Sequence, residues 1–385
     1  MKKGLLLLFV GITLLCNAQT DSIVHDGIYR NYILHLPASY NPSYFHPLVI
    51  NMHGLGSNAA QQQFYSAMDA VADTANFIVV YPNGMPADTV VSDGKQWNVG
   101  QNIPFHSGVD DVGFISSLLD SLISFYSIDT TRIYSTGMSM GGFMSYRLAC
   151  ELEHRIAAIA SVTGVMLDSL PHYCQSHQPI PVLQMHGTSD SIVPYNGLAG
   201  LVSVENTISH WIQHNNCPTT PTTTTFPDIF ANDNSTVEKF HYGPGDDSSE
   251  VVLYKVTNGG HSWPGGFPVP NLGNTNMDIN ATHEIWHFFR NHQLNYSPPS
   301  ATSAIKNAIN FSLYPNPFTN QITISFKEKY NAQIALYNSI GMKLKEVVIN
   351  NTNTFQLETG NIKKGAYFLK IRKGNNLYYK QLIKL

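Results

Sequence analysis

A glycine-rich stretch in the middle of the chain holds a serine in a setting suited to nucleophilic chemistry. Residues 132–142 read Arg-Ile-Tyr-Ser-Thr-Gly-Met-Ser-Met-Gly-Gly, so Ser139 lies in a G-x-S-x-G pattern between a β-prone run and a helix-like segment. A tight turn there places the serine at a helix N-terminus, where backbone N–H groups favour developing negative charge. Gly137 and Gly141 are needed because a Cβ at either position would collide with the neighbouring turn. The pattern alone is a weak signal, since a glycine-rich turn with a capping serine has the same sequence.

Two further residues complete the set that a catalytic serine needs, and each follows a strand-like run. Asp190 is the predicted acid, which would accept a hydrogen bond from a histidine and fix its tautomer. Asp168 and Asp228 are rival acids, but neither follows so clear a strand. His261 lies in a glycine-rich loop, which suits an imidazole that must reach Ser139. The chain order Ser, Asp, His is that of the α/β-hydrolases.

A second glycine-rich loop lies upstream and predicts where negative charge would be stabilised. His53-Gly54-Leu55-Gly56 follows the apolar run 47–52 and matches the H-G-x-G type of loop. Such a loop supplies one backbone N–H of an oxyanion hole, which we assign to Leu55, and Met140 directly after the serine supplies the other. His53 itself is predicted to shape the loop through hydrogen bonds rather than to act as an acid or base.

Taken in order, these motifs resemble the secreted poly(3-hydroxybutyrate) depolymerase and feruloyl esterase group of α/β-hydrolases, the type found in carbohydrate esterase family 1. The resemblance runs from about Gly27 to Gln293 and rests on these segments: His53–Gly56, Tyr81–Gly84, Trp97, Asp110–Ile115, Gly137–Gly142, Leu148–Cys150, Ala157–Ala160, His186–Asp190, Val193–Tyr195 and Gly259–Gly265. It implies a Ser139–Asp190–His261 triad that hydrolyses carboxylic esters through an acyl-enzyme. Asn83 departs from the pattern, since similar proteins often have Asp there, and we expect no effect on the chemistry.

The choice of ester is predicted less sharply than the reaction. Tyr81, Trp97, Tyr195 and Trp263 are predicted to bind substrate as aromatic walls of the cleft. Such walls suit a feruloyl ring by stacking, but they equally suit a hydroxyalkanoate chain or a synthetic aromatic polyester. Acetyl esters of polysaccharides are a further candidate within the same group. A catalytically silent hydrolase-fold binding protein is the alternative from another class, and the complete triad argues against it.

The apolar patterns predict a doubly wound α/β fold with a mostly parallel sheet for residues 19–295. Helices are expected at 59–76, 109–127, 142–152, 202–215 and 281–292, and strands at 29–36, 47–52, 77–81, 133–134, 156–162, 181–186 and 251–256. The run of Pro and Thr at 218–225 is read as an exposed insertion, with a lid edge as the alternative. No nucleic-acid partner is expected, because the catalytic part is acidic. No cofactor is expected either.

The start of the chain and its cysteines indicate export. Residues 1–18 have a basic start, a short apolar core and a small residue at the end, which is the pattern of a cleaved signal peptide and too short for a stable membrane span. Cys150, Cys174 and Cys217 remain outside it, so one disulfide and one free thiol are expected. The resemblance favours Cys174–Cys217. The Cys and His spacings match no zinc site, and we predict no metal.

The last part of the chain differs in character from the rest. Residues 296–308 have the composition of a linker, and residues 309–385 are strand-rich and read as a small all-β sandwich domain. From residue 301 onward there are 12 Lys and Arg against 3 Asp and Glu, whereas residues 1–300 hold 10 against 23. A basic unit is therefore tethered to an acidic one.

This tail resembles the C-terminal sorting domain of Bacteroidetes type IX secretion. The matching segments are Leu313–Pro317, Asn338–Gly341, Lys364–Tyr367 and Lys380–Leu385. The resemblance implies a type IX secretion machinery as partner and a final location that is secreted or at the cell surface. The ester substrate is implied by the resemblance of the catalytic part. A carbohydrate-binding module is the alternative, with an exposed tyrosine platform in place of the tryptophans that the tail lacks.

Overall fold

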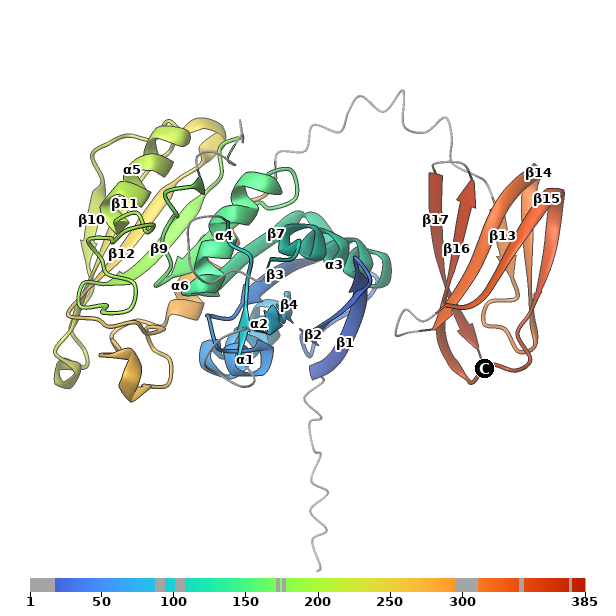
Figure 1. Cartoon of the computed structure of the whole chain (residues 1–385), viewed down its shortest axis with the longest axis horizontal. Coiled ribbons are helices and arrows are strands. Elements are labelled where there is room, and N and C mark those ends of the chain that lie inside the picture. The colour runs from blue at the N-terminus through green and yellow to red at the C-terminus, as the bar shows by residue number, and fades with distance from the viewer. Residues whose placement is uncertain are drawn as a thin grey trace, which may run out of the picture.

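A computed structural model describes residues 18–86, 94–100, 108–170, 174, 178–294, 311–338, 343–373 and 376–384. The predicted linker lies outside these residues, as does the predicted signal peptide except for its last residue. Figure 1 shows a large α/β unit followed by a separate body of long strands. Among the described residues, no helix combines the length and the apolar character that crossing a membrane requires.

A ten-stranded sheet forms the centre of the α/β unit. Its strands, in spatial order, are β1 (Ala18–His25), β2 (Ile28–His35), β4 (Ile78–Pro82), β3 (His46–Met52), β7 (Ile128–Met138), β8 (Ala158–Val162), β9 (Val182–Gly187), β12 (Val251–Thr257), β11 (Thr236–Tyr242) and β10 (Thr222–Thr225). The six strands from β4 to β12 pair in parallel, and both edges are antiparallel. The carboxyl ends of the parallel strands therefore meet at one edge, which is where such sheets place ligands. A small separate hairpin joins β5 (Met85–Pro86) to β6 (Lys95–Gln96).

Helices cover both faces of this sheet, so the unit has three layers (Figure 1). They are α1 (Ala59–Ser66), α2 (Met68–Ala75), α3 (Asp111–Phe125), α4 (Met140–Glu151), α5 (Val204–His214) and α6 (Ala281–Phe289). One apolar core joins α3, α4 and α5 to the sheet, and another joins α1, α2 and α6. The sheet has an apolar core on each face because successive side chains of a strand point to opposite faces. In β3, Leu48 and Ile50 belong to the first core and Val49 belongs to the second. The predicted doubly wound α/β fold is confirmed.

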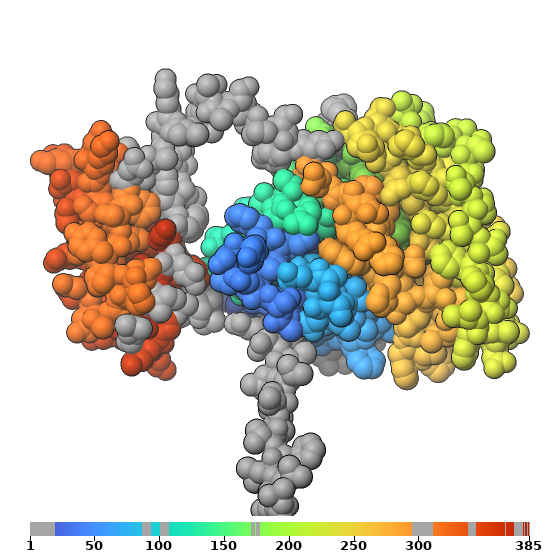
Figure 2. Space-filling model, turned by 180° about the vertical axis from the view of Figure 1, so that it is seen from behind, coloured from blue at the N-terminus to red at the C-terminus, as the bar shows by residue number. Residues whose placement is uncertain are grey.

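Local departures from the predicted elements have physical causes. The helix expected over 59–76 is broken at Ala67, whose φ of 47° is left-handed and lets α2 restart with Met68 buried. The Thr run is exposed, as expected, but it forms the edge strand β10, because its backbone pairs with β11. In Figure 2, the segment of α1 and α2 lies beside the last part of the α/β unit, where the Thr282 hydroxyl donates to the Ser66 carbonyl.

The C-terminal unit is an antiparallel five-stranded sheet around its own core. Its strands are β13 (Phe311–Tyr314), β14 (Gln321–Asn338), β15 (Lys343–Glu358), β16 (Gly365–Lys373) and β17 (Asn376–Lys384). The long strand β14 pairs with β13 in its first half, with β16 in its second half, and with β15 along most of its length. The prediction of a small all-β domain is confirmed.

Candidate active site

Ser139 lies at the sharp turn between β7 and α4. Its φ of 54° and ψ of −118° are strained for a residue with a side chain, at a cost of roughly 1–3 kcal/mol. Neighbouring glycines make the turn possible: a Cβ on Gly137 would lie 2.6 Å from the Gly141 carbonyl carbon, and one on Gly141 would lie 2.2 Å from the Met52 carbonyl oxygen. The predicted reason for both glycines is therefore correct. Ser139 remains partly exposed.

The loop after β3 lies directly against this serine. A Cβ on Gly54 would lie 3.3 Å from the Ser139 Cβ, so the H-G-x-G loop and the serine turn are in close approach. Leu55, the next residue, is exposed over 42% of its surface. Met140 is the first residue of α4, where backbone N–H groups have no partner within the helix. Leu55 and Met140, whose backbone N–H groups are predicted to form the oxyanion hole, thus directly follow Gly54 and Ser139, the two residues that lie against each other.

His53 is a buried structural residue. The Gly84 N–H donates to its Nε2 over 3.0 Å, so the ring carries its proton on Nδ1, which donates to the Gly54 carbonyl over 2.8 Å. Burial lowers the pKa of His53 to about 4, so the ring is neutral at physiological pH. The Trp97 indole N–H donates to the His53 carbonyl over 2.9 Å. These contacts support the prediction that His53 shapes the loop.

Asp190 and His261 are brought together after β9 and β12. The His261 Nδ1 donates to the Asp190 Oδ2 over 2.8 Å, and both side chains are buried. The other oxygen, Oδ1, accepts from the backbone N–H groups of Ile192 and Val193 over 2.9 and 2.8 Å. This carboxylate therefore fixes the histidine tautomer and leaves the Nε2 lone pair for proton transfer. The rival acids Asp168 and Asp228 are exposed.

A second histidine, to which the sequence motifs assign no role, supports the same carboxylate. The Gln184 amide N–H lies 3.0 Å from the His186 Nδ1, so the imidazole carries its proton on Nε2. That N–H faces the Val193 carbonyl at 2.8 Å and the Asp190 Oδ2 at 3.3 Å. Tyr146 of α4 donates to the Gln184 Oε1 over 2.6 Å. A buried chain of hydrogen bonds thus joins the serine helix to Asp190.

The charge on Asp190 is stabilised despite its burial. Burial on its own raises the pKa of this carboxyl, but hydrogen bonds from His186 and His261 hold it below its ordinary value. Asp190 is therefore ionised at neutral pH. His186 supports Asp190, and the only sequence signal for this contact was that His186 lies four residues before the acid.

The predicted aromatic walls are wrong in their placement. Tyr81 and Trp97 are fully buried, and Trp263 and Tyr195 are only 1% and 7% exposed. Their polar atoms bind inside the protein: Tyr81 to Asp69, Trp97 to His53, Trp263 to Thr282 and Tyr195 to Glu205. The rings hold the surrounding loops and present no open face to a substrate. Sequence shows that these residues are aromatic but not which side of an element they occupy.

The cysteines pair differently from the expectation. Cys150 at the end of α4 is bonded to Cys174, and Cys217 is a buried free thiol. One disulfide and one free cysteine were expected, but the pairing of Cys174 with Cys217 was wrong. The Cys217 sulfur instead lies 3.9 Å from the Ser249 carbonyl.

Two regions of the chain match known families. Residues 42–220 match the phospholipase/carboxylesterase family, and residues 312–385 match the secretion system C-terminal sorting domain. The chain is 28% identical, over 62% of its length, to a bifunctional acetylxylan esterase/xylanase of Neocallimastix patriciarum, 31% of which is covered. It is 30% identical, over 50% of its length, to feruloyl esterase B of Piromyces equi, 37% of which is covered.

A solved structure supports the fold. Acetyl xylan esterase from Aspergillus awamori matches with a TM-score of 0.50 at 16% identity, over 71% of this chain and 99% of that chain. Together, these findings confirm the feruloyl esterase part of the predicted resemblance, the α/β-hydrolase fold and the sorting domain, and they add an acetylxylan esterase to the relatives; the poly(3-hydroxybutyrate) depolymerase part stays a prediction. The chain spans about a third of the length of the two relatives named above.

Proposed function

We propose that this chain is an exported serine esterase that acts on carboxylic esters. The observation that carries the proposal is the 2.8 Å pair of Asp190 and His261, held at the same sheet edge as the strained turn of Ser139. A buried carboxylate that fixes an imidazole tautomer, with a serine at a helix N-terminus, is the machinery of acyl transfer. The likeness to named esterases supports the same reaction.

In the proposed mechanism, His261 Nε2 removes the proton from the Ser139 hydroxyl as its oxygen attacks the ester carbonyl. The backbone N–H groups of Leu55 and Met140 donate to the oxyanion of the tetrahedral intermediate. The imidazolium then protonates the leaving alcohol, and the acyl group remains on Ser139. Water, deprotonated by His261, attacks that acyl-enzyme, and the carboxylic acid is released with regeneration of the hydroxyl. Asp190 stays ionised and stabilises the imidazolium throughout.

The substrates we propose are feruloyl or acetyl esters of plant polysaccharides. Relatives named for both activities support this choice. Polyhydroxybutyrate and aromatic polyesters remain predictions of the sequence alone. Because the predicted aromatic walls are buried, ring stacking by those four residues no longer argues for a phenolic substrate over an acetyl one.

A direct test compares the purified protein with its Ser139→Ala variant on p-nitrophenyl acetate, methyl ferulate, acetylated xylan and hydroxybutyrate polymer. We expect hydrolysis of p-nitrophenyl acetate and of methyl ferulate or acetylated xylan, with the variant reduced to residual turnover while its melting temperature stays near that of the parent. More than a few per cent of parental activity in the variant would reject Ser139 as the nucleophile. A folded parent that hydrolyses none of the four would favour the silent binding protein.

The tail gives the proposed location. Residues 312–385 match a sorting domain of a secretion system, which indicates type IX export to the cell surface or the medium. Passage into the periplasm through the predicted signal peptide of residues 1–18 is part of the proposal. Truncation after residue 294 tests the sorting role in the native host, where we expect the shortened enzyme to accumulate in the periplasm.

A further inference from the structure

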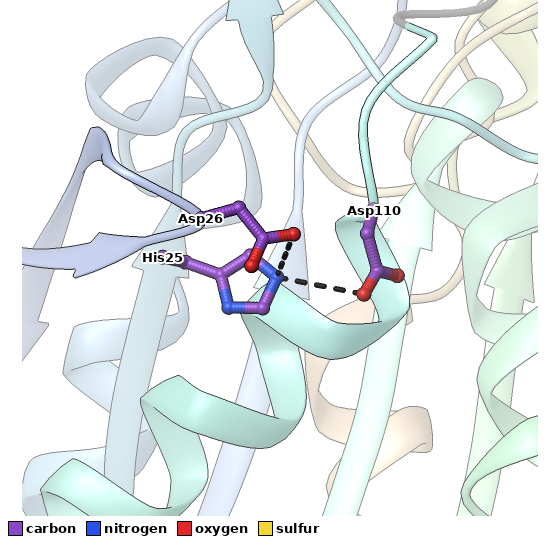
Figure 3. A group of neighbouring side chains, drawn as sticks. All are labelled: His25, Asp26 and Asp110. Carbon is purple, nitrogen blue, oxygen red and sulfur yellow. Dashed lines mark ion pairs between the residues drawn. The ribbon is translucent and has the colours of Figure 1, made fainter.

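Three potential metal ligands meet outside the triad and the oxyanion loop, where the turn between β1 and β2 packs against the start of α3 (Figure 3). His25 ends β1, Asp26 lies in the turn, and Asp110 is the N-cap of α3. The His25 Nε2 lies 3.6 Å from the Asp26 Oδ2 and 3.5 Å from the Asp110 Oδ2. Residues separated by more than 80 positions thus bring one nitrogen and two oxygens within 4.8 Å of one another.

The histidine is oriented for this arrangement by a neighbour on α3. Its Nδ1 lies 3.1 Å from the Ser117 hydroxyl, which can accept the Nδ1 proton and so leave a lone pair on Nε2. That Nε2 is buried and has no hydrogen-bond partner in the part of the chain that the structure describes. A lone pair facing two carboxylates is repelled unless a positive charge lies between them.

The spacing fits a small tetrahedral cation. Metal–ligand distances of about 2.1 Å place neighbouring ligands of a tetrahedron about 3.4 Å apart, close to the two separations given above. One imidazole with two carboxylates is a donor set of zinc-type ions, whereas calcium and magnesium take oxygen ligands. The exposed carboxylates of Asp26 and Asp110, at 72% and 54%, leave room for water at the fourth position.

We propose that His25, Asp26 and Asp110 bind one divalent ion of the zinc type, which fastens the N-terminal hairpin to α3. The ion stabilises the edge of the large sheet and takes no part in ester hydrolysis. This proposal is independent of the proposed function, since its ligands are not part of the triad or the oxyanion loop.

Two conservative variants remove ligands while keeping the folding role of each residue. Asp110→Asn retains the N-cap, because Asn and Asp cap helices about equally well and the Gly113 N–H keeps its acceptor. Asp26→Asn retains the turn, because Asn-Gly is favoured where two successive residues have positive φ, here 48° and 77°. His283→Ala, which removes an exposed imidazole from α6, is the control.

The test uses full-length protein without an affinity tag, freed of metal with a chelator and titrated calorimetrically with zinc chloride. We expect one ion per chain and a rise in melting temperature of about 5 °C at saturating zinc. Each Asp→Asn variant should weaken zinc binding at least about tenfold and lose most of that rise, while His283→Ala binds like the parent. Cobalt in place of zinc should give the visible bands of a tetrahedral site.

Two results would overturn the proposal. Absence of saturable zinc binding would leave His25 as a side chain that only pairs with the two carboxylates, and the metal site would be rejected. Zinc binding that both Asp→Asn variants retain at parental strength would place the ion elsewhere and reject this site. The esterase rate is recorded alongside as a separate readout, so that the metal site is tested even if the enzyme is silent.

Discussion

Replacement of His186 tests whether the buried hydrogen-bond chain positions the acid of the proposed triad. His186→Leu introduces an apolar side chain of similar size and removes the N–H that faces Asp190 at 3.3 Å. A hydrogen bond to a charged acceptor is worth about 1.5–3 kcal/mol, and this one is long and shared with the Val193 carbonyl at 2.8 Å, so we take the lower end. A loss of about 1.5 kcal/mol corresponds to roughly a tenfold fall in kcat.

The remaining contacts of Asp190 limit the effect. Its Oδ1 still accepts two backbone N–H groups, and its Oδ2 still accepts from His261, so the variant should retain far more activity than one that lacks the carboxylate. KM should change little, because the lost contact acts on the acid and not on bound substrate. The unpaired Val193 carbonyl should also lower the free energy of unfolding by about 1–3 kcal/mol.

A matched variant separates positioning from simple destabilisation. Tyr146→Phe removes the 2.6 Å hydrogen bond to Gln184 at the far end of the same chain and leaves every contact of Asp190 in place. It should cost similar stability but keep kcat within about twofold. Steady-state kinetics on p-nitrophenyl acetate and thermal unfolding measure both quantities, and His186→Gln, which keeps an N–H donor, should restore part of kcat. A parental kcat in His186→Leu, or an equal loss in Tyr146→Phe, would refute the reasoning.

Four further outcomes are expected. Asp190→Asn should fold yet lose roughly 10³–10⁴ in kcat, measured on the same small ester, because the amide favours the wrong imidazole tautomer; a near-parental rate would move the acid role elsewhere. Burial lowers the pKa of His53 from 6.5 to about 4, so between these two pH values the unfolded chain is protonated at this residue and the folded chain is not. The free energy of unfolding should therefore fall by roughly 3 kcal/mol as the pH falls from 6.5 to 4. His53→Gln should remove this pH dependence, as measured by urea titrations. EDTA should lower the melting temperature but leave kcat unchanged, and a loss of kcat that zinc restores would reveal a metal within the active site. A chain ending at residue 294 should keep kcat and KM on a small ester; a higher KM on polymer alone, with normal export, would make the tail a substrate-binding module.

The features best predicted from the sequence are those in which the local backbone geometry admits only one residue type. Ser139 is recognisable because its turn needs glycine at 137 and 141, and the structure shows the backbone atoms that a side chain would strike. Asp190 and His261 are recognisable because each follows a strand of the parallel sheet, whose carboxyl ends must meet. The doubly wound fold followed from the same alternation of apolar strands and helices.

The wrong predictions concern choices that depend on distant partners. The direction of an aromatic ring is decided by what packs against it, so Tyr81 and Trp97 gave no sign that their hydrogen bonds end at Asp69 and His53. Cysteine spacing does not define connectivity. Cys150 reaches Cys174 because the end of α4 brings their Cα atoms to 4.6 Å.

The same reasoning explains why the sequence analysis assigned no role to His186 or to His25. A histidine is informative only when its two ring nitrogens have different partners, because those partners decide which nitrogen carries the proton. In His186, Gln184 donates to Nδ1 and thereby turns Nε2 into a donor for Asp190. In His25, Ser117 can accept from Nδ1 and thereby turns Nε2 into a ligand. One ring is therefore suited to support a carboxylate and the other to bind a cation, a distinction that only the packing of the neighbouring elements determines.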